Sequence, residues 1–400
     1  MKKLCLVFTL FLGTLPAASA SAAPGLLVGA ADDMLKWVPQ EAAAAVRALG
    51  MRAVRITLRW SPSQTALSAT QIAELDNAVA AAGSDIRIVV SIYSTPGDNA
   101  PRTSTSRKQY CKFARSVLVR YPSINDVGIW NEPNKSFFWK PQFNPGGTSA
   151  APAAYEKLLA RCWDDLHAFR PAVNVIAPGT APRGNDNPNA VSNISHSPGN
   201  FIRKVGEAYR ASGRRKPLFD IVAHHAYGEH AAERPWKKHA STTISEGDWD
   251  KLMQALGDAF LGTAQPIPGH CAGRCVPIWY LEAGYQTAVD EAKLPLYAGI
   301  ENEARALPDF AGGEPAFPPP GADTFAPDQW TQIVDGIRLA YCQPYVEAFF
   351  NFMLWDEPVL QGWQSAPLWA DRTPKDSYPA FQQVIGEANS GSVDCSQLKG

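Results

Sequence analysis

The sequence predicts an α/β protein built as a single (β/α)8 TIM barrel. Short apolar, β-branched segments recur along the chain, segments with helical periodicity separate them, and this alternation occurs eight times. An open, doubly wound sheet is the alternative, but it would need a Gly-rich phosphate turn after its first strand. The sequence GLLVG at 25–29 does not provide one, so a closed parallel barrel is favoured.

The expected elements alternate along the chain. The strands are expected at 26–30, 53–60, 87–93, 126–130, 173–178, 219–225, 277–282 and 347–355, and the helices at 39–49, 69–82, 106–119, 153–169, 201–212, 248–261 and 328–342. In the second strand, alternation places apolar side chains on one face and Arg55, Thr57 and Arg59 on the other. A polar row on a buried strand is accommodated at the mouth of a barrel, where barrel proteins carry their functional residues.

We expect residues 1–23 to form a secretory signal peptide. The chain begins Met1-Lys2-Lys3, residues 4–15 are almost wholly apolar, and small residues follow at 17–23. This apolar run is too short for a membrane-spanning helix, which needs about 20 residues. The mature protein is therefore expected to be secreted, as an extracellular, periplasmic or cell-wall-associated protein with no membrane span.

Residues 24–400 are expected to form one domain and to act as a monomer. No internal repeat and no long linker divides them. The Pro-rich stretch at 308–327 lies between the seventh and eighth expected strands, so we interpret it as a long surface insertion within the barrel.

The cysteines indicate disulfide bonds. Removal of the signal peptide takes away Cys5 and leaves an even number, which in an exported chain is typical of paired cysteines. Many pairings are possible. We expect a local clip in one loop, a link between two helices and a link from a late helix to the tail, namely Cys271–Cys275, Cys111–Cys162 and Cys342–Cys395. A metal site at Cys271 and Cys275 is the alternative, but it lacks a second ligand pair.

The charge balance argues against nucleic acid and anionic membranes as partners. Lys and Arg total 37 against 38 for Asp and Glu, which gives a formal net charge of −1. A neutral substrate is consistent with this balance.

Two glutamates close expected strands. Glu132 follows the fourth strand in the sequence Trp130-Asn131-Glu132-Pro133, and Glu282 ends the seventh. Carboxyl groups on the ends of different strands can face each other across a cleft at about 5 Å, the separation in glycosidases that act by double displacement. A polar turn at Glu132 and a buried, salt-bridged Glu282 are the alternatives. Arg55 is the nearby cation in either case.

Further polar and aromatic residues close the sixth and eighth strands. His225 and Tyr227 follow His224, and Tyr227 is suited to donate a hydrogen bond to Glu282. A zinc site that includes the two histidines is the alternative, although no partner motif accompanies them. Trp355 at the end of the eighth strand is suited to stack on a sugar ring.

These motifs together resemble clan A of the glycoside hydrolases, nearest to families 5 and 39. The resemblance extends from Arg55 to the tail at 375–381. It implies a retaining enzyme without a cofactor or a metal ion, acting on a carbohydrate. By this resemblance the residues have separate functions: Glu132 is the acid/base, Glu282 the nucleophile, Asn131 the contact to the sugar 2-hydroxyl, Arg55 and Tyr227 the supports of Glu282, His225 a substrate contact and Trp355 the floor of the subsite.

Some positions depart from the pattern of clan A. Glu357 is a further carboxylate that could compete for a catalytic role, and we interpret it as a loop residue. A catalytically silent carbohydrate-binding barrel is the alternative function. Loop aromatics favour endo-action on a β-linked glycan, with Trp139 and Trp363 as the proposed sugar platforms. Packing of long loops is the other interpretation for this set, which comprises Phe137, Phe138, Trp139, Trp236, Trp363 and Trp369.

Overall fold

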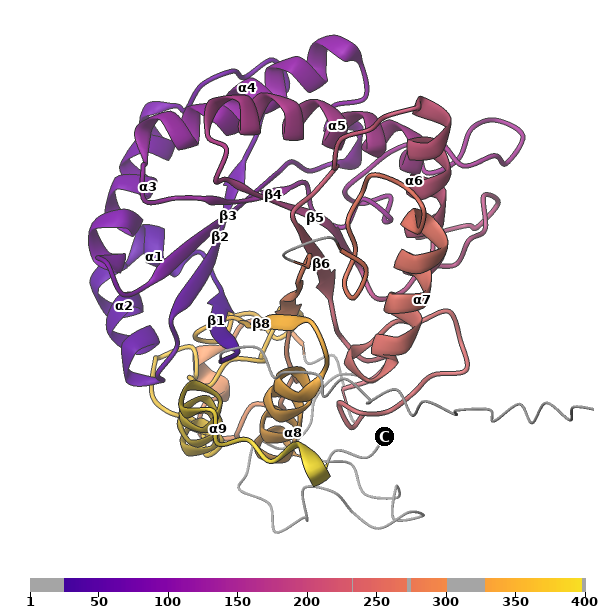
Figure 1. Ribbon diagram of the computed structural model, residues 1–400. Helices are drawn as coiled ribbons and strands as arrows, with labels where there is room; N and C mark the ends of the chain where they lie inside the picture. The colour runs from indigo at the N-terminus through magenta and orange to yellow at the C-terminus, as the bar shows by residue number, and fades with distance from the viewer. Residues whose placement is uncertain (1–24, 232, 272–274, 301–327, 398–400) are drawn as a thin grey trace, which may run out of the picture.

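The computed structural model describes residues 25–231, 233–271, 275–300 and 328–397. Within these ranges, eight parallel strands form a closed barrel in sequence order, with β8 paired back to β1, so the predicted TIM barrel is confirmed (Figure 1). The strands are β1 (Leu27–Ala31), β2 (Ala53–Arg59), β3 (Arg87–Tyr93), β4 (Asp126–Ile129), β5 (Asn174–Thr180), β6 (Ile221–His225), β7 (Ile278–Ala283) and β8 (Val346–Phe352).

Helices form a ring outside the strands, and Figure 1 shows α8 and α9 at the seam between β1 and β8. Two helices were not expected from the sequence: the short α1, and α9, which packs on α8 and β1. The helices are α1 (Met34–Trp37), α2 (Pro39–Ala48), α3 (Ala69–Ala82), α4 (Ser104–Arg120), α5 (Ala151–Phe169), α6 (Pro198–Ser212), α7 (Trp249–Phe260), α8 (Gln329–Cys342) and α9 (Tyr378–Ser390).

Local sequence signals set the helix ends. The Ser68 side chain accepts a hydrogen bond from the Gln71 backbone at the start of α3, and the Gln71 side chain accepts one from the Ser68 backbone. This reciprocal pair satisfies two N–H groups that the helix cannot pair internally. Gly213 follows the C-terminal end of α6 and has the left-handed conformation, which a residue without Cβ adopts readily.

The core has two layers, one inside the barrel and one between the barrel and the helices. Side chains such as Ala53, Val89 and Trp279 fill the interior. Val54 and its alternate neighbours on β2 pack outward against the helices, whereas Arg55 lies on the inward face. The predicted alternation of β2 is therefore confirmed, and it directs a guanidinium into the barrel mouth.

All three expected disulfides are present. Cys111–Cys162 joins α4 to α5, Cys342–Cys395 joins α8 to the tail, and Cys271–Cys275 closes a short loop. Their Cα–Cα distances are 4.9, 5.5 and 5.2 Å, respectively. These bonds are compatible with an oxidising, extracellular environment.

The predicted signal peptide and the Pro-rich stretch at 308–327 lie outside the described residues. No helix among the residues that the structure describes combines the length and apolar character needed to cross a bilayer. The eighth strand is shorter than expected, because it ends at Phe352 and the chain turns at Met353, which has a positive φ of 80°.

Candidate active site

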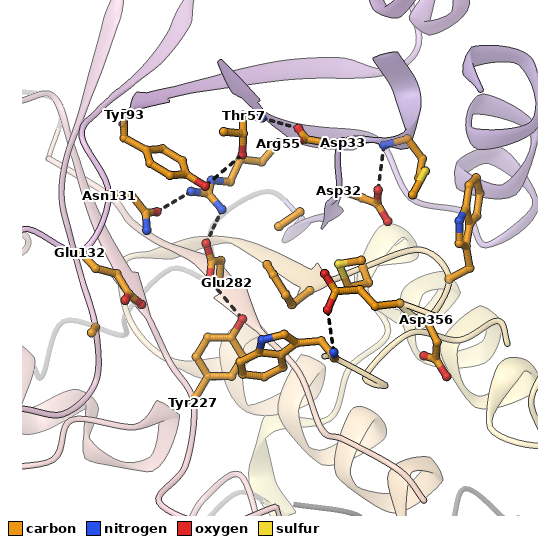
Figure 2. A pocket seen from close by; sticks show the side chains of 18 of the residues that line it. Asp32, Asp33, Arg55, Thr57, Tyr93, Asn131, Glu132, Tyr227, Glu282 and Asp356 are labelled. Atoms are coloured by element: carbon orange, nitrogen blue, oxygen red, sulfur yellow. Dashed lines mark hydrogen bonds and ion pairs between the residues drawn. The ribbon is translucent and has the colours of Figure 1, made fainter. Parts of the chain in front are cut away.

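A cavity of about 770 Å³ lies at the C-terminal ends of the strands. The residues that the sequence placed at these ends meet here, although they come from strands far apart in the chain (Figure 2). Those that line the cavity are Arg55, Asn131, Glu132, Tyr227, Glu282 and Trp355. His225 lies behind this surface, is 1% exposed and does not line the cavity.

The backbone after β4 is bent so that Glu132 points into the cavity. Trp130 and Glu132 both have positive φ, at 69° and 39°, which costs side-chain-bearing residues of order 1 kcal/mol each. The Glu132 backbone N donates to Gly179 O of β5 at 2.9 Å. Surrounding contacts therefore hold the bend in place.

An aromatic cluster holds Trp130, the residue directly before Asn131 and Glu132, in place. The Trp130 ring packs within 5.6 to 6.4 Å of Trp60, Tyr110 and Trp139, and its Nε1 donates to Phe138 O at 2.9 Å. Trp139 is fully buried in this cluster. The expectation that Trp139 forms a sugar platform is therefore wrong, because the loop after β4 folds this ring back into the core.

Glu282 is held by a buried ion pair from the facing side of the barrel. Arg55 Nη1 donates to Glu282 Oε1, Arg55 Nη2 donates to Asn131 Oδ1 at 2.7 Å, and Arg55 Nε donates to Ser91 Oγ at 2.7 Å. Arg55 is 5% exposed, so its charge is compensated inside the protein. A single guanidinium thus positions the carboxylate of Glu282 and the amide of Asn131.

Two more groups converge on the carboxylates. Tyr227 Oη donates to Glu282 Oε2 at 3.1 Å. His225 Nδ1 lies 2.9 Å from Glu132 Oε1 and 3.4 Å from Glu282 Oε2. His225 therefore lies between the two glutamates, in a place that suits it to position them.

The environment of Glu282 favours its ionised form. Burial raises the pKa of Glu282, but the charges of His225 and Arg55 and hydrogen bonds from Arg55 and Tyr227 outweigh that effect, so the pKa is lowered. Burial, together with the negative charges of Glu282 and Glu132, raises the pKa of Tyr227 well above its usual value, so the phenol stays a donor.

Asn131 presents its amide group to the cavity. Its Oδ1 accepts from Arg55, which fixes the orientation of the amide and aims Nδ2 away from the guanidinium. Among the described residues, no hydrogen bond from Asn131 Nδ2 to protein is found. This nitrogen is suited to donate to a sugar hydroxyl beside Glu132.

His224 does not belong to the site. Its Nδ1 lies 2.9 Å from Thr180 Oγ1 and its Nε2 lies 2.7 Å from Ile244 O, and burial lowers the pKa of His224 to about 4. Both ring nitrogens are thus used within the fold, which rules out a zinc site that includes the two adjacent histidines.

Glu132, His225 and Glu282 offer ligand atoms within 4.8 Å of one another, a spacing that a metal ion could bridge. Arg55 already places a positive charge on Glu282, however, and that charge would repel a bound cation. That the protein needs no metal ion therefore stays a prediction.

Trp363 supplies the aromatic surface beside Tyr227. Because β8 ends at Phe352, Trp355 lies three residues beyond the strand and packs under Arg372, whose guanidinium carbon is 5.2 Å from the ring. Trp363 stands 4.9 Å from the Tyr227 ring and 5.1 Å from that of Phe352. Both tryptophans line the cavity, at different places.

The remaining loop aromatics divide between cavity and core. Phe138 lines the cavity and packs on Tyr93, whereas the exposed Phe137 packs on Phe138. Trp369 is buried under Lys375, and Trp236 does not line the cavity. The packing interpretation therefore holds for Trp369.

The rival carboxylate Glu357 lines the cavity but serves the loop after β8. Its Oε2 accepts from the Trp363 backbone N at 2.8 Å. The adjacent Asp356 is buried, pairs with Lys375 at 3.0 Å and accepts from Tyr297. These contacts agree with the interpretation of Glu357 as a loop residue.

Sequence reasoning missed several residues that line the cavity. Tyr93 ends β3, and Asp32 and Asp33 follow β1. Their positions at the C-terminal ends of strands were the available signal. Lys135 and Arg183 lie in the loops after β4 and β5, where the sequence offered no pattern that distinguishes them from surface residues.

Solved structures of glycoside hydrolases resemble this fold. A family 39 glycoside hydrolase from Bacteroides cellulosilyticus matches with a TM-score of 0.55 and 15% identity, over 90% of this chain and 64% of that one. A family 39 β-xylosidase from Caulobacter crescentus matches with a TM-score of 0.53 and 16% identity, over 92% and 73%. An exo-β-1,4-mannosidase from an Opitutaceae bacterium matches with a TM-score of 0.54 and 13% identity, over 95% and 63%.

This chain spans less than two thirds of the first and third of these neighbours. No protein-family model matches the sequence, and no curated protein matches it. At such low identities the similarity establishes the shared fold. It agrees with the resemblance to clan A, nearest to family 39, that the strand-end motifs predicted.

Proposed function

We propose that this protein is a secreted, monomeric glycoside hydrolase that retains the anomeric configuration of its substrate. One observation carries the proposal: carboxylate oxygens of Glu132 and Glu282 lie within 4.8 Å of each other at the barrel mouth. Retaining glycosidases place their two carboxyl groups about 5 Å apart, whereas inverting enzymes leave a wider gap that admits a water molecule.

In the first step, Glu282 attacks the anomeric carbon and the bond from that carbon to the leaving oxygen breaks. Glu132 transfers its proton to the leaving oxygen, so the departing group leaves as a neutral alcohol. Arg55 and Tyr227 keep Glu282 ionised and aimed before the attack.

In the second step, the ionised Glu132 takes a proton from water, and the resulting hydroxide displaces Glu282 from the anomeric carbon. Glu282 returns as a carboxylate and Glu132 returns protonated, so the cycle is balanced. His225 Nδ1 lies 2.9 Å from Glu132 and 3.4 Å from Glu282, so it helps to hold the two carboxylates in place during this exchange.

A β-linked glycan is the proposed substrate. The fold neighbours include a β-xylosidase and an exo-β-1,4-mannosidase, which supports this linkage. Endo-action retains support only from Phe138 and Trp363, because Trp139 is buried. Product analysis on oligosaccharides decides the matter: release of internal fragments supports endo-action, and release of monosaccharide alone contradicts it.

Azide rescue tests the two roles. A screen of aryl β-glycosides first identifies a hydrolysed sugar. Azide added to the Glu132→Ala variant is expected to restore turnover with a β-glycosyl azide product, whereas azide added to Glu282→Ala is expected to produce the α-glycosyl azide. Glu357→Ala is the matched control and should need no rescue. Exchanged products would reverse the assignment, and full activity of both variants would remove the mechanism.

A further inference from the structure

Two positively charged side chains line the cavity beside Glu132. Lys135 and Arg183 belong to the loops that follow β4 and β5. The Lys135 backbone N donates to Glu132 O at 2.9 Å, so Lys135 lies one turn after the acid/base residue. Lys135 Nζ lies 3.4 Å from Arg183 O, which brings the two residues together.

In the part of the chain that the structure describes, neither cation forms an ion pair with a carboxylate. Lys135 Nζ contacts the Arg183 carbonyl, and Arg183 Nη1 donates to the Glu229 carbonyl at 2.8 Å. Both partners are neutral backbone groups. Among these residues, neither positive charge is therefore neutralised by an ion pair at this end of the cavity.

The backbone around these residues is built to hold a fixed position. Asn134 Nδ2 donates to Ala181 O and to His196 O, each at 3.1 Å. Asn134 Oδ1 accepts from Ala181 N at 2.9 Å. Asn134 is fully buried, so it locks the loop that carries Lys135 onto the loop that carries Arg183.

Holding the charged Lys135 there without an ion pair is unfavourable. Burial lowers the pKa of Lys135, the nearby Glu132 carboxylate opposes that effect, and the charge of Arg183 adds to it. A ligand with a negative charge would relieve both the desolvation and the repulsion.

The opposite end of the cavity has a different charge pattern. Asp33 pairs with Lys36 at 3.2 Å, and Asp356 pairs with Lys375 at 3.0 Å. Figure 2 shows Glu132 on one side of Glu282 and Asp356 on the other. The cations without an ion pair thus lie next to the acid/base residue, whereas the carboxylates Asp33 and Asp356 at the other end are paired with lysines.

We propose that Lys135 and Arg183 bind a carboxylate or sulfate group on the sugar that leaves, so the substrate carries an anionic residue on the leaving-group side of the cleaved bond. Glu132 protonates the leaving oxygen, so its place in the cavity identifies the leaving-group side of the cleaved bond. This inference therefore rests on the proposed function. It departs from the expectation of a neutral substrate, which followed from the net charge of the chain.

Paired aryl glycosides test the inference by kinetics. The glycone is the one hydrolysed in the screen, and the leaving group is either 4-hydroxybenzoate or its neutral amide, 4-hydroxybenzamide. The wild type should show an approximately tenfold lower KM for the carboxylate, and this preference should weaken as salt is added. A second pair, 4-hydroxybenzenesulfonate and its sulfonamide, distinguishes a sulfate-type preference from a carboxylate preference.

The double variant Lys135→Gln/Arg183→Gln should lose the preference, measured as the ratio of KM for the amide to KM for the carboxylate, so that any change common to both substrates cancels. Lys140→Gln/Lys238→Gln is the matched control, because it removes two exposed lysines outside the cavity. The control should keep the preference. No preference in the wild type for either anion, or a preference that survives in the double variant, would overturn the inference.

Direct binding separates this inference from the proposed function. Calorimetry of the full chain with D-glucuronic acid, glucose 6-sulfate and glucose should show tighter binding of at least one anionic sugar, lost in the double variant. Such binding without hydrolysis of any glycoside would overturn the proposed reaction and support the anion site. Hydrolysis of neutral glycosides with no anion preference in binding or kinetics would overturn the anion site alone.

Discussion

Replacement of Arg55 by Met tests how the fold prepares Glu282, the proposed nucleophile. The change removes the donor to Glu282 Oε1 and the donor to Asn131 Oδ1, but keeps a long apolar stem in the barrel. Glu282 would then be a buried carboxylate with only Tyr227 and His225 beside it. Breaking a buried pair by removing one partner costs about 3–5 kcal/mol, because an uncompensated charge remains.

Glu282 can avoid part of that cost by binding a proton. In the wild type its lowered pKa keeps it ionised, so activity is present above that pKa and is lost as the pH falls through it. Without Arg55 the pKa of Glu282 rises, and the acidic limb of the kcat/KM profile should move to higher pH. At the pH optimum of the wild type, kcat/KM should fall by roughly a hundredfold.

The assay is the pH profile of kcat/KM on an activated aryl glycoside. The matched control is Arg87→Met, which breaks an arginine–carboxylate pair with Asp126 at 2.6 Å, at the start of β3 and away from the cavity. The control should lose stability and leave the acidic limb in place. An Arg55→Met variant with an unmoved limb and nearly full activity would refute the reasoning.

Three further outcomes are expected. Tyr227→Phe should lower kcat/KM about tenfold and raise the acidic limb slightly, because it removes one hydrogen bond to Glu282 and keeps the ring against Trp363; an unchanged profile would contradict this. Trp139→Ala should lower the free energy of unfolding by about 3–5 kcal/mol in urea titrations, whereas Trp363→Ala should mainly raise KM; the reverse pattern would restore Trp139 as a platform. Burial lowers the pKa of His224 from 6.5 to about 4, so its contribution to stability is complete above pH 6.5 and is lost as the pH falls towards 4. The His224→Gln variant should therefore show a smaller drop in Tm between pH 7 and pH 4.5 than the wild type. An equal drop would contradict this.

Much of the barrel could be predicted because its signals are local. The β2 alternation placed Arg55 inward, and apolar runs that end in Glu132 or Glu282 marked the end of the barrel at which the proposed catalytic residues lie. The limits of β8 were harder to predict, since its apolar run continues through Leu354 and Trp355 without Gly or Pro. The turn at Met353 depends on a positive φ that the sequence does not reveal.

The roles of loop residues depended on tertiary contacts. Trp139 and Trp363 look alike in sequence, but the first packs against Trp130 in the core and the second lines the cavity. The closeness of Lys135 to Arg183 depends on Asn134, which joins the loops that follow the adjacent strands β4 and β5. No local period encodes such contacts, so these positions followed only from the structure.

Covalent trapping of the nucleophile tests the central claim most directly. In a 2-deoxy-2-fluoro aryl glycoside of the hydrolysed sugar, the fluorine slows both the formation and the hydrolysis of the glycosyl-enzyme. An activated leaving group speeds the formation again, so the glycosyl-enzyme accumulates. Peptide mass spectrometry should then find one sugar on the peptide that contains Glu282, and none on the Glu282→Gln variant. A label on Glu132 or Glu357, or inactivation without any covalent sugar, would contradict the assignment of Glu282 as the nucleophile.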